Sequence, residues 1–205
     1  MQHDPLLQYR EQHKHRLNYM PWLYWTLKPK HREWAEAWQS EYQAYLMSME
    51  TVEIGENCFI SPLAHIFAEP GRNIRIGDNS FIAADCTLHG PLQIGNEVAI
   101  NHHCILDGGK AGIKLHDQVR IAAYSHLYAF DHGMHAELPI YQQAVTSKGI
   151  EIGRDVWLGA HVGIKDGIKI GDHAVIGMNS MVTKNVENYA VMAGNPAQLI
   201  RYRNE

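Results

Sequence analysis

Aliphatic residues recur at every sixth position over most of this chain. The series runs from Ile54 to Val182 and contains 18 positions in six groups of three. Of the 17 steps between consecutive positions, 14 are six residues long. The positions are Ile54, Ile60, Ile66, Ile76, Ile82, Leu88, Ile94, Ile100, Leu106, Leu115, Ile121, Leu127, Ile152, Leu158, Ile164, Ile170, Ile176 and Val182.

The neighbours of these aliphatic residues repeat as well. A small or apolar residue lies two positions earlier, as at Val52, Cys58 and Ala64, and residues two apart on a strand share one face. Glycine often follows the aliphatic residue, as at Gly55 and Gly77, and it suits tight corners and close backbone approach. The pattern predicts a triangular parallel β-helix with three hexads per coil. Six coils at roughly 4.8 Å each give a prism about 29 Å tall.

Three longer steps interrupt the period, and all three fall between the third hexad of one coil and the first hexad of the next. They are the steps 66→76, 106→115 and 127→152, so every insertion leaves the prism at the same corner. The longest one inserts residues 128–149, which contain the stretch "YAFDHGMHAELP". Because a long loop on a rigid scaffold usually carries function, we expect the chemistry here.

The first 50 residues do not repeat. The stretch "HREWAEAWQSEYQAYLM" places Trp34, Trp38, Tyr42 and Tyr45 at helical spacing on one amphipathic face. We interpret residues 1–50 as a helical cap over the open end of the prism, where strand edges would otherwise be unpaired. An acceptor-site or oligomer contact, and an interfacial membrane helix, are the alternatives. The predicted organisation is a cap (1–50), a β-helix domain (51–185) with the inserted loop 128–149, and a C-terminal tail (186–205).

Composition narrows the functional classes. The chain has 205 residues, 45% of them hydrophobic, and a net charge of −4 with no long basic run, which argues against nucleic acid as a partner. It shows neither the apolar core of a signal peptide nor an 18-residue apolar run, so we expect a cytoplasmic protein without membrane insertion. The 14 histidines make any single histidine weak support for a site.

The three cysteines are odd in number and lack the spacing of a zinc ribbon or a disulfide framework. The register places Cys58, Cys86 and Cys104 at the inward small position, so we expect buried core thiols. Cys86 and Cys104 stack on adjacent coils, near enough for a disulfide, but a cytoplasmic setting disfavours one.

Three stretches resemble the hexapeptide-repeat O-acetyltransferases of the galactoside, maltose and polysaccharide type. They are "AAYSHLYAFDHGMHAELP", "DVWLGAHVGIKDGIKIGDHAVIGMNSMVTK" and "AGNPAQLIR". The resemblance covers about residues 51–201 and implies a left-handed β-helix, which is a known exception to right-handed parallel crossovers. It also implies an acyltransferase with acetyl-CoA as donor, no metal, and a homotrimer with sites between subunits.

In that family the loop histidine is the catalytic base, and the resemblance assigns this role to His132. The chemistry fits, because a sugar hydroxyl needs a base with a pKa near neutrality when it attacks a thioester. His135 on the same loop is the rival. His126 directly precedes an inward leucine, so we expect its side chain to lie on the outer face of the prism.

The remaining site residues also follow from the resemblance. Ala160 matches an oxyanion-donor position that is often serine, so only its backbone N–H could serve here. Trp157 matches a tryptophan beside the pantetheine arm of coenzyme A. The cofactor groove would further contain Met178, Thr183, Lys184 and Arg201, the last two as phosphate or adenine contacts. In "NHHCILDG", Asn101 and Asp107 match acceptor contacts, while His102 and His103 depart from the galactoside type and leave the acceptor open.

Several alternative functions remain at this stage. An antibiotic (xenobiotic) acetyltransferase or an amine acetyltransferase would use the same fold and base. A β-helical zinc hydratase of the gamma carbonic anhydrase kind needs three histidines across a subunit boundary. Its two loop-side ligands lie five apart, whereas His126 and His132 lie six apart. A non-catalytic scaffold is the last alternative.

Overall fold

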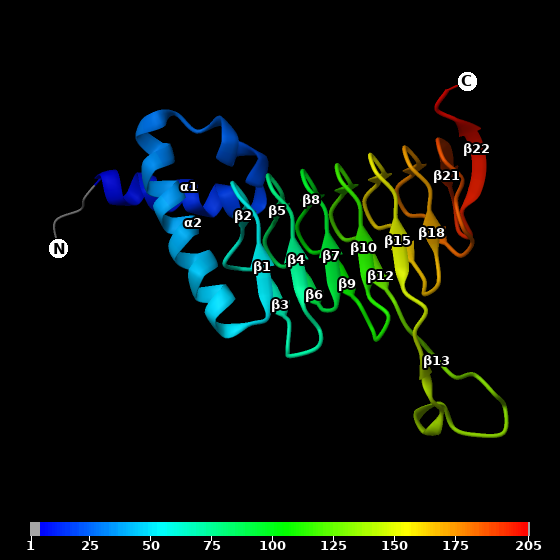
Figure 1. Cartoon of the computed structure of the whole chain (residues 1–205). Helices are drawn as coiled ribbons and strands as arrows, with labels where there is room; N and C mark the ends of the chain where they lie inside the picture. The colour runs from blue at the N-terminus through cyan, green and yellow to red at the C-terminus, as the bar shows by residue number, and fades with distance from the viewer. Residues whose placement is uncertain (1–4, 205) are drawn as a thin grey trace.

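Three parallel sheets wrap around one elongated core in the computed structural model of the chain (Figure 1). The structure describes residues 5–204, so residues 1–4 of the expected cap and Glu205 of the expected tail lie outside the described residues. The architecture is the parallel β-helix of about six coils that the hexad pattern predicts, with the left-handed winding that the family resemblance implies. We call the sheets A, B and C in chain order, and the prism edges AB, BC and CA after the sheets that they join.

Each coil contributes one short strand to each sheet. Sheet A contains β1 (Val52–Ile54), β4 (Ile74–Ile76), β7 (Leu92–Ile94), β10 (Ile113–Leu115), β15 (Ile150–Ile152) and β18 (Lys169–Ile170). Sheet B contains β2 (Phe59–Ile60), β5 (Phe81–Ile82), β8 (Ala99–Ile100), β11 (Arg120–Ile121), β16 (Trp157–Leu158) and β19 (Val175–Ile176). Sheet C contains β3 (His65–Phe67), β6 (Thr87–His89), β9 (Ile105–Asp107), β12 (His126–Tyr128), β17 (Gly163–Ile164) and β20 (Met181–Val182).

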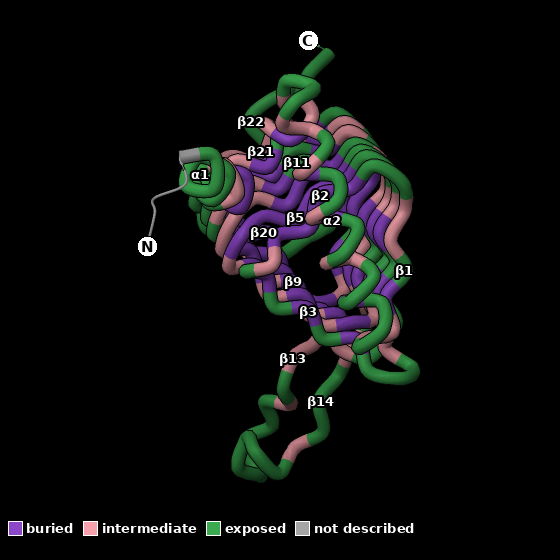
Figure 2. Tube along the Cα trace, turned by 90° about the vertical axis from the view of Figure 1, so that its left-hand side faces the viewer, coloured by how far each residue is buried: buried purple, intermediate pink, exposed green. Residues whose placement is uncertain are grey.

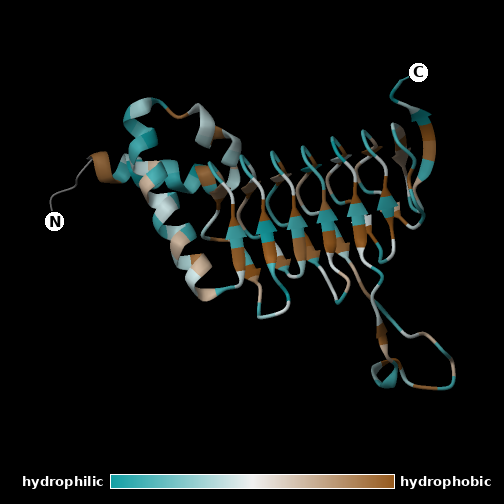
Figure 3. Cartoon of the chain, viewed as in Figure 1, coloured by the Kyte–Doolittle hydropathy of each residue, from teal (hydrophilic) through white to brown (hydrophobic). Residues whose placement is uncertain are grey.

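The aliphatic ladder is confirmed in register and in burial. In sheet A, Ile54 pairs with Ile76, and Ile76 pairs with Ile94; the other two sheets continue in the same way. All 18 positions pack into the core, and of these Ile54 alone is only half-buried, at the end of the prism. The buried residues lie on the inner side of the coils (Figure 2), and the outward strand positions of sheet A are hydrophilic (Figure 3). The three cysteines are buried and unpaired, as predicted.

The glycines that directly follow the aliphatic residues serve one of the two roles expected of them. A Cβ on Gly159 would lie 2.6 Å from the backbone nitrogen of Met178 on the next coil, so this glycine permits close approach of the coils. The left-handed backbone of the corners lies two residues further along the chain and is adopted by other residue types. Asn57 and His103, for example, have φ values of 53° and 59°.

The N-terminal segment covers the end of the prism and part of sheet B. It consists of α1 (Pro5–Tyr19), the 3₁₀ helix η1 (Pro21–Thr26) and α2 (Pro29–Met49). The buried Gln39 side chain of α2 donates to the Ile60 carbonyl (3.1 Å) and accepts from the Ile60 N–H (2.8 Å), so it replaces a missing neighbouring strand. Tyr24 of η1 packs against Phe59 on the outer face of sheet B.

Tyr45 does not lie on the buried face that the sequence pattern predicts. Its side chain is 60% exposed, because Leu46 takes the inward position against the first coil. Within the described residues, no helix is long and apolar enough to cross a membrane.

The segment expected as a tail continues sheets A and B. Val186 forms a parallel bridge with Ile170, and β21 (Ala190–Ala193) pairs in parallel with β19. The chain then reverses, and β22 (Gln198–Tyr202) pairs antiparallel with β21. A further partial coil and a hairpin therefore close this end of the prism (Figure 1).

Candidate active site

The inserted loop projects from edge CA as a hairpin (Figure 1). Its strands β13 (Asp131–His132) and β14 (Val145–Thr146) pair antiparallel, and His132 lies opposite Val145. The short 3₁₀ helix η2 (Ile140–Gln142) lies at the tip. The His132 side chain is exposed, and its ring stands edge-on to Phe130 with 6.3 Å between centroids. The predicted base therefore sits on an ordered strand pair with its imidazole open to an incoming substrate.

Two side chains that the sequence reading did not identify fix the base of this loop. Ser147 Oγ donates to the Ala129 carbonyl and accepts from the N–H groups of Lys110 (3.0 Å) and Ala111 (2.9 Å). The carboxylate of Asp166, whose residue is 5% exposed, accepts from the N–H groups of Lys148 (2.8 Å) and Gly149 (2.9 Å). Buried polar groups with such complete partners hold the strand stem in one position.

The rival histidine lies at the loop tip. The Gln143 amide accepts from the His135 N–H (2.8 Å) and donates to the His135 carbonyl (2.9 Å). These contacts fix the backbone of His135, and its side chain is exposed. His126 lies on β12 with its ring outward, and its Nδ1 is 3.2 Å from the Tyr124 carbonyl oxygen, as expected for a wall residue.

Three of the residues predicted to contact coenzyme A or its thioester lie together on sheet B and at edge BC. Trp157 of β16 is 52% exposed, and Met178 is 63% exposed on the next coil. Ala160 lies at the corner after Trp157, at the register position that Met178 takes on the next coil, and its carbonyl accepts from the Asn179 N–H (2.9 Å). Among residues 5–204 the Ala160 N–H has no hydrogen-bond acceptor, so it is available as a donor. These residues combine exposed apolar side chains with one unpaired backbone donor.

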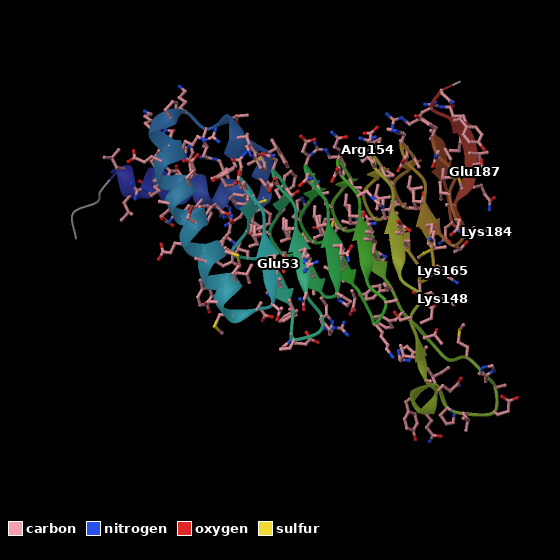
Figure 4. The ribbon with its side chains drawn as sticks, viewed as in Figure 1. Glu53, Lys148, Arg154, Lys165, Lys184 and Glu187 are labelled. Atoms are coloured by element: carbon pink, nitrogen blue, oxygen red, sulfur yellow. The ribbon has the colours of Figure 1, made fainter. Side chains whose placement is uncertain are left out.

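The other residues predicted to contact coenzyme A lie elsewhere. Thr183 and Lys184 follow β20 at edge CA, and both are exposed. Lys148, Lys165 and Lys184 follow one another along this side of the last coils (Figure 4). Arg201 is exposed on β22, where its Nη1 donates to the Tyr202 carbonyl (3.0 Å). One chain thus divides the predicted coenzyme A contacts between two edges and the C-terminal hairpin.

The two predicted acceptor contacts are also separated within one chain. Asn101 lies at edge BC, and its side-chain amide donates to the Ile121 carbonyl (2.9 Å). Asp107 lies at edge CA, where its carboxylate is 3.4 Å from His89 Nδ1 and 3.6 Å from Arg72 Nη2. Neither neighbour of Asp107 was predicted. His89 could have been, because it lies 18 residues earlier at the same register position, whereas Arg72 lies in an insertion outside the six-residue period.

Edge BC carries a column of aromatic and histidine rings. His103, Tyr124 and His161 stack in parallel at centroid distances of 4.7 Å and 4.9 Å. Beside them, His102 has a lowered pKa, chiefly because burial disfavours its charged form. Within residues 5–204 its buried Nδ1 has no hydrogen-bond partner. The column could have been found from the sequence, since each stacked residue comes three positions after an inward aliphatic residue.

A groove of about 480 Å³ runs over sheet A beside the loop stem, with Lys114, Glu151 and Lys169 in its lining. The Glu151 carboxylate lies 3.2 Å from Lys169 Nζ and 3.0 Å from His116 Nε2, and the hydrogen bond from His116 is the main cause of its lowered pKa. With Lys148 also in its lining, the groove carries three lysines against one glutamate, so it stays cationic. Among residues 5–204, no three His, Cys, Asp or Glu side chains are grouped to hold a metal ion.

Comparison with known proteins gives consistent relatives. The family described as bacterial transferase hexapeptide (six repeats) matches residues 149–184. A galactoside O-acetyltransferase of Escherichia coli is 32% identical over 152 residues, which cover 74% of this chain and 64% of that protein. A chloramphenicol acetyltransferase of Agrobacterium fabrum is 31% identical over 164 residues, which cover 72% of this chain and 78% of that protein.

The coverage of these relatives differs. A probable acetyltransferase of Mycobacterium tuberculosis is 30% identical over 136 residues, 66% of this chain but only 44% of that protein. The chain thus spans less than two thirds of this relative and of the galactoside enzyme. Among solved structures, a mutant of the N-acyltransferase AntD from Bacillus cereus, in complex with dTDP and coenzyme A, superposes with a TM-score of 0.71 at 29% identity. The alignment covers 78% of this chain and 89% of that one.

Proposed function

The chain belongs to the hexapeptide-repeat family of acetyltransferases, and from this premise we propose that it transfers an acetyl group from acetyl-CoA to a hydroxyl of a sugar or saccharide precursor. The observation that carries the proposal is His132, an exposed imidazole on a hairpin whose stem is fixed by buried hydrogen bonds. Neutral imidazole accepts a proton at the pH where a sugar hydroxyl must lose one.

The proposed reaction is a direct transfer. His132 accepts the proton of the acceptor hydroxyl while the hydroxyl oxygen attacks the thioester carbonyl carbon. The Ala160 N–H donates to the oxyanion of the tetrahedral intermediate, which a backbone donor can do without a serine at this position. The C–S bond then breaks, the acetyl ester remains on the acceptor, and the proton held by His132 passes to the coenzyme A thiolate. No acyl-enzyme forms, so the buried cysteines have no part in the reaction.

The exposed side chains fit coenzyme A in two parts. Trp157 and Met178 offer apolar contact area beside Ala160, which suits the pantetheine arm. Lys184 and Arg201 offer cations for the phosphates. Because one chain places these groups on different edges, we propose that edge CA of one copy meets edge BC of the next in a homotrimer, which completes each site.

Binding of acetyl-CoA tests this proposal without knowledge of the acceptor. We expect calorimetry to show one acetyl-CoA per chain for the wild type and for His132→Ala, because the base acts on the acceptor. Trp157→Ala should weaken binding. If neither the wild type nor His132→Ala binds acetyl-CoA, the chain is not an acetyl-CoA-dependent enzyme.

An antibiotic acceptor is the second candidate, and the similarity to the chloramphenicol acetyltransferase over 78% of its length favours it. The same base would deprotonate an antibiotic hydroxyl. Thiol release from acetyl-CoA with chloramphenicol, compared with a panel of sugars, separates the two acceptor classes. The similarity to an N-acyltransferase adds amino sugars to that panel.

A further inference from the structure

Six side chains occupy one register position along edge CA, each directly after an inward aliphatic residue. The loop divides this row into two parts, four residues before it and two after it. The first part consists of Phe67, His89, Asp107 and Tyr128, and the second of Lys165 and Thr183. The two parts differ in chemistry, so we infer that they contact different ligands.

The part after the loop is cationic. Lys165 and the adjacent Lys184 point from the last coils on the same side as Lys148 (Figure 4). This charge suits the phosphates of the donor in the proposed function. The part before the loop contains aromatic rings and the carboxylate of Asp107, with Glu69 beside it, and these groups do not suit phosphates.

Between its aromatic ends, the first part contains a mixed cluster of donors and acceptors. His89 lies between two carboxylates, with Nε2 3.3 Å from Glu69 Oε1 and Nδ1 3.4 Å from Asp107 Oδ2. Arg72 joins the cluster, since its Nη2 is 3.3 Å from His89 Nδ1 and its Nε is 3.1 Å from Glu69 Oε1. The His89 and Asp107 side chains are 33% and 24% exposed, so solvent or a ligand reaches them. Such clusters suit hydroxyl groups, which both donate and accept.

Exposed aromatic rings stand at the two ends of this part of the row. Phe67 is 49% exposed and Tyr128 is 39% exposed. From Tyr128 the rings continue to Phe130 at a centroid distance of 5.8 Å, and from there to His132. The row therefore continues from edge CA, through Phe130, to the proposed base His132. Its three coil steps span about 14 Å, which is longer than one sugar ring.

We propose that this row, from Tyr128 to Phe67, binds a neutral oligosaccharide acceptor, with the acetylated residue at His132 and further sugar residues extending toward Phe67. Aromatic faces pack against the apolar faces of sugar rings, and the cluster around His89 pairs with their hydroxyls. The carboxylates of Glu69 and Asp107 outnumber the one guanidinium of Arg72, so the cluster would repel an acidic sugar chain. The inference rests on the proposed function and names the substrate class of the same site.

The test is retention of the full chain on an array of immobilised neutral oligosaccharides and their matching monosaccharides. We expect stronger retention on chains of three or more residues. Phe67→Ala and Tyr128→Ala should each lower this retention roughly five- to tenfold, the loss expected for one aromatic contact. Tyr189→Ala is the matched control, because Tyr189 is an aromatic residue, 40% exposed, that stacks on His173 at edge AB, away from both edges of the proposed site. Asp107→Asn is a second variant, which tests the polar cluster without removing an aromatic ring.

Three results would overturn the inference: no retention on any oligosaccharide, equal retention on mono- and oligosaccharides, or an equal loss in Tyr189→Ala. Calorimetry with acetyl-CoA on the same samples separates this failure from failure of the proposed function. If acetyl-CoA binds while the array result fails, only the oligosaccharide inference is wrong. If acetyl-CoA does not bind, the proposed function itself is wrong.

Discussion

At the scale of single residues, the two loop histidines differ in the contacts that fix their backbone. His132 lies in the paired part of the hairpin, opposite Val145, which is two residues from Ser147 in the stem that Ser147 and Asp166 fix. His135 lies nearer the tip, where Gln143 alone bonds its backbone through side-chain atoms. A catalytic base must keep its position within a fraction of an ångström, which favours the residue nearer the rigid scaffold.

Substitution of the base gives the residue-scale prediction. We expect His132→Ala to lower the turnover number by about 10²- to 10⁴-fold, the usual contribution of a general base. The dissociation constant for acetyl-CoA should not change. His135→Ala serves as the control and should retain most of its turnover, measured by thiol release with a sugar acceptor. A loss confined to His135→Ala would transfer the role of base to that residue.

At the scale of elements, the sequence predicts what depends on the six-residue period and misses what does not. The period predicts the strands, their register and the edge from which the loop leaves. It misses the partial coil after residue 182, because the step from Val182 to Val186 is only four residues long. It also misses the cluster around His89, because Glu69 and Arg72 lie in an insertion outside the period. Contacts between insertions of different coils depend on side-chain conformation, which a period does not encode.

The loop stem gives the element-scale prediction. Asp166→Ala leaves the N–H groups of Lys148 and Gly149 without their carboxylate, so the hairpin gains freedom. We expect the turnover number to fall roughly tenfold, since small displacements of a base are costly. The KM for acetyl-CoA should not change, and hydrogen exchange at both amides should accelerate. Asp166→Asn, which keeps one acceptor oxygen, should recover part of the turnover.

Asp172→Ala is the matched control for the stem. Asp172 also accepts a backbone N–H, that of Arg154 at 2.7 Å, but it does so at edge AB, away from the loop. Equal losses of turnover in Asp166→Ala and Asp172→Ala would mean that Asp166 acts only through general stability. An unchanged turnover number together with faster exchange would mean that the loop stem does not position the base.

At the scale of the whole molecule, the predicted site residues lie on two edges of one rigid prism. Edge CA carries His132, Thr183 and Lys184, while edge BC and the adjoining face of sheet B carry Trp157 and Ala160. A continuous core of aliphatic residues separates these edges, and such a core does not deform enough to bring them together. If one site uses both sets, two copies must therefore supply them.

Mixing two inactive variants tests this assembly. His132→Ala impairs edge CA, and the double variant Trp157→Ala with Met178→Asp impairs edge BC; each alone should be nearly inactive. When equal amounts are unfolded together and refolded, random assembly gives about a quarter of the sites two intact edges, so about a quarter of wild-type turnover should return. Sedimentation should show three chains of 23.3 kDa, about 70 kDa in total. If the mixture stays inactive although mixed trimers form, each site belongs to one chain, and the division of the site between two edges is wrong.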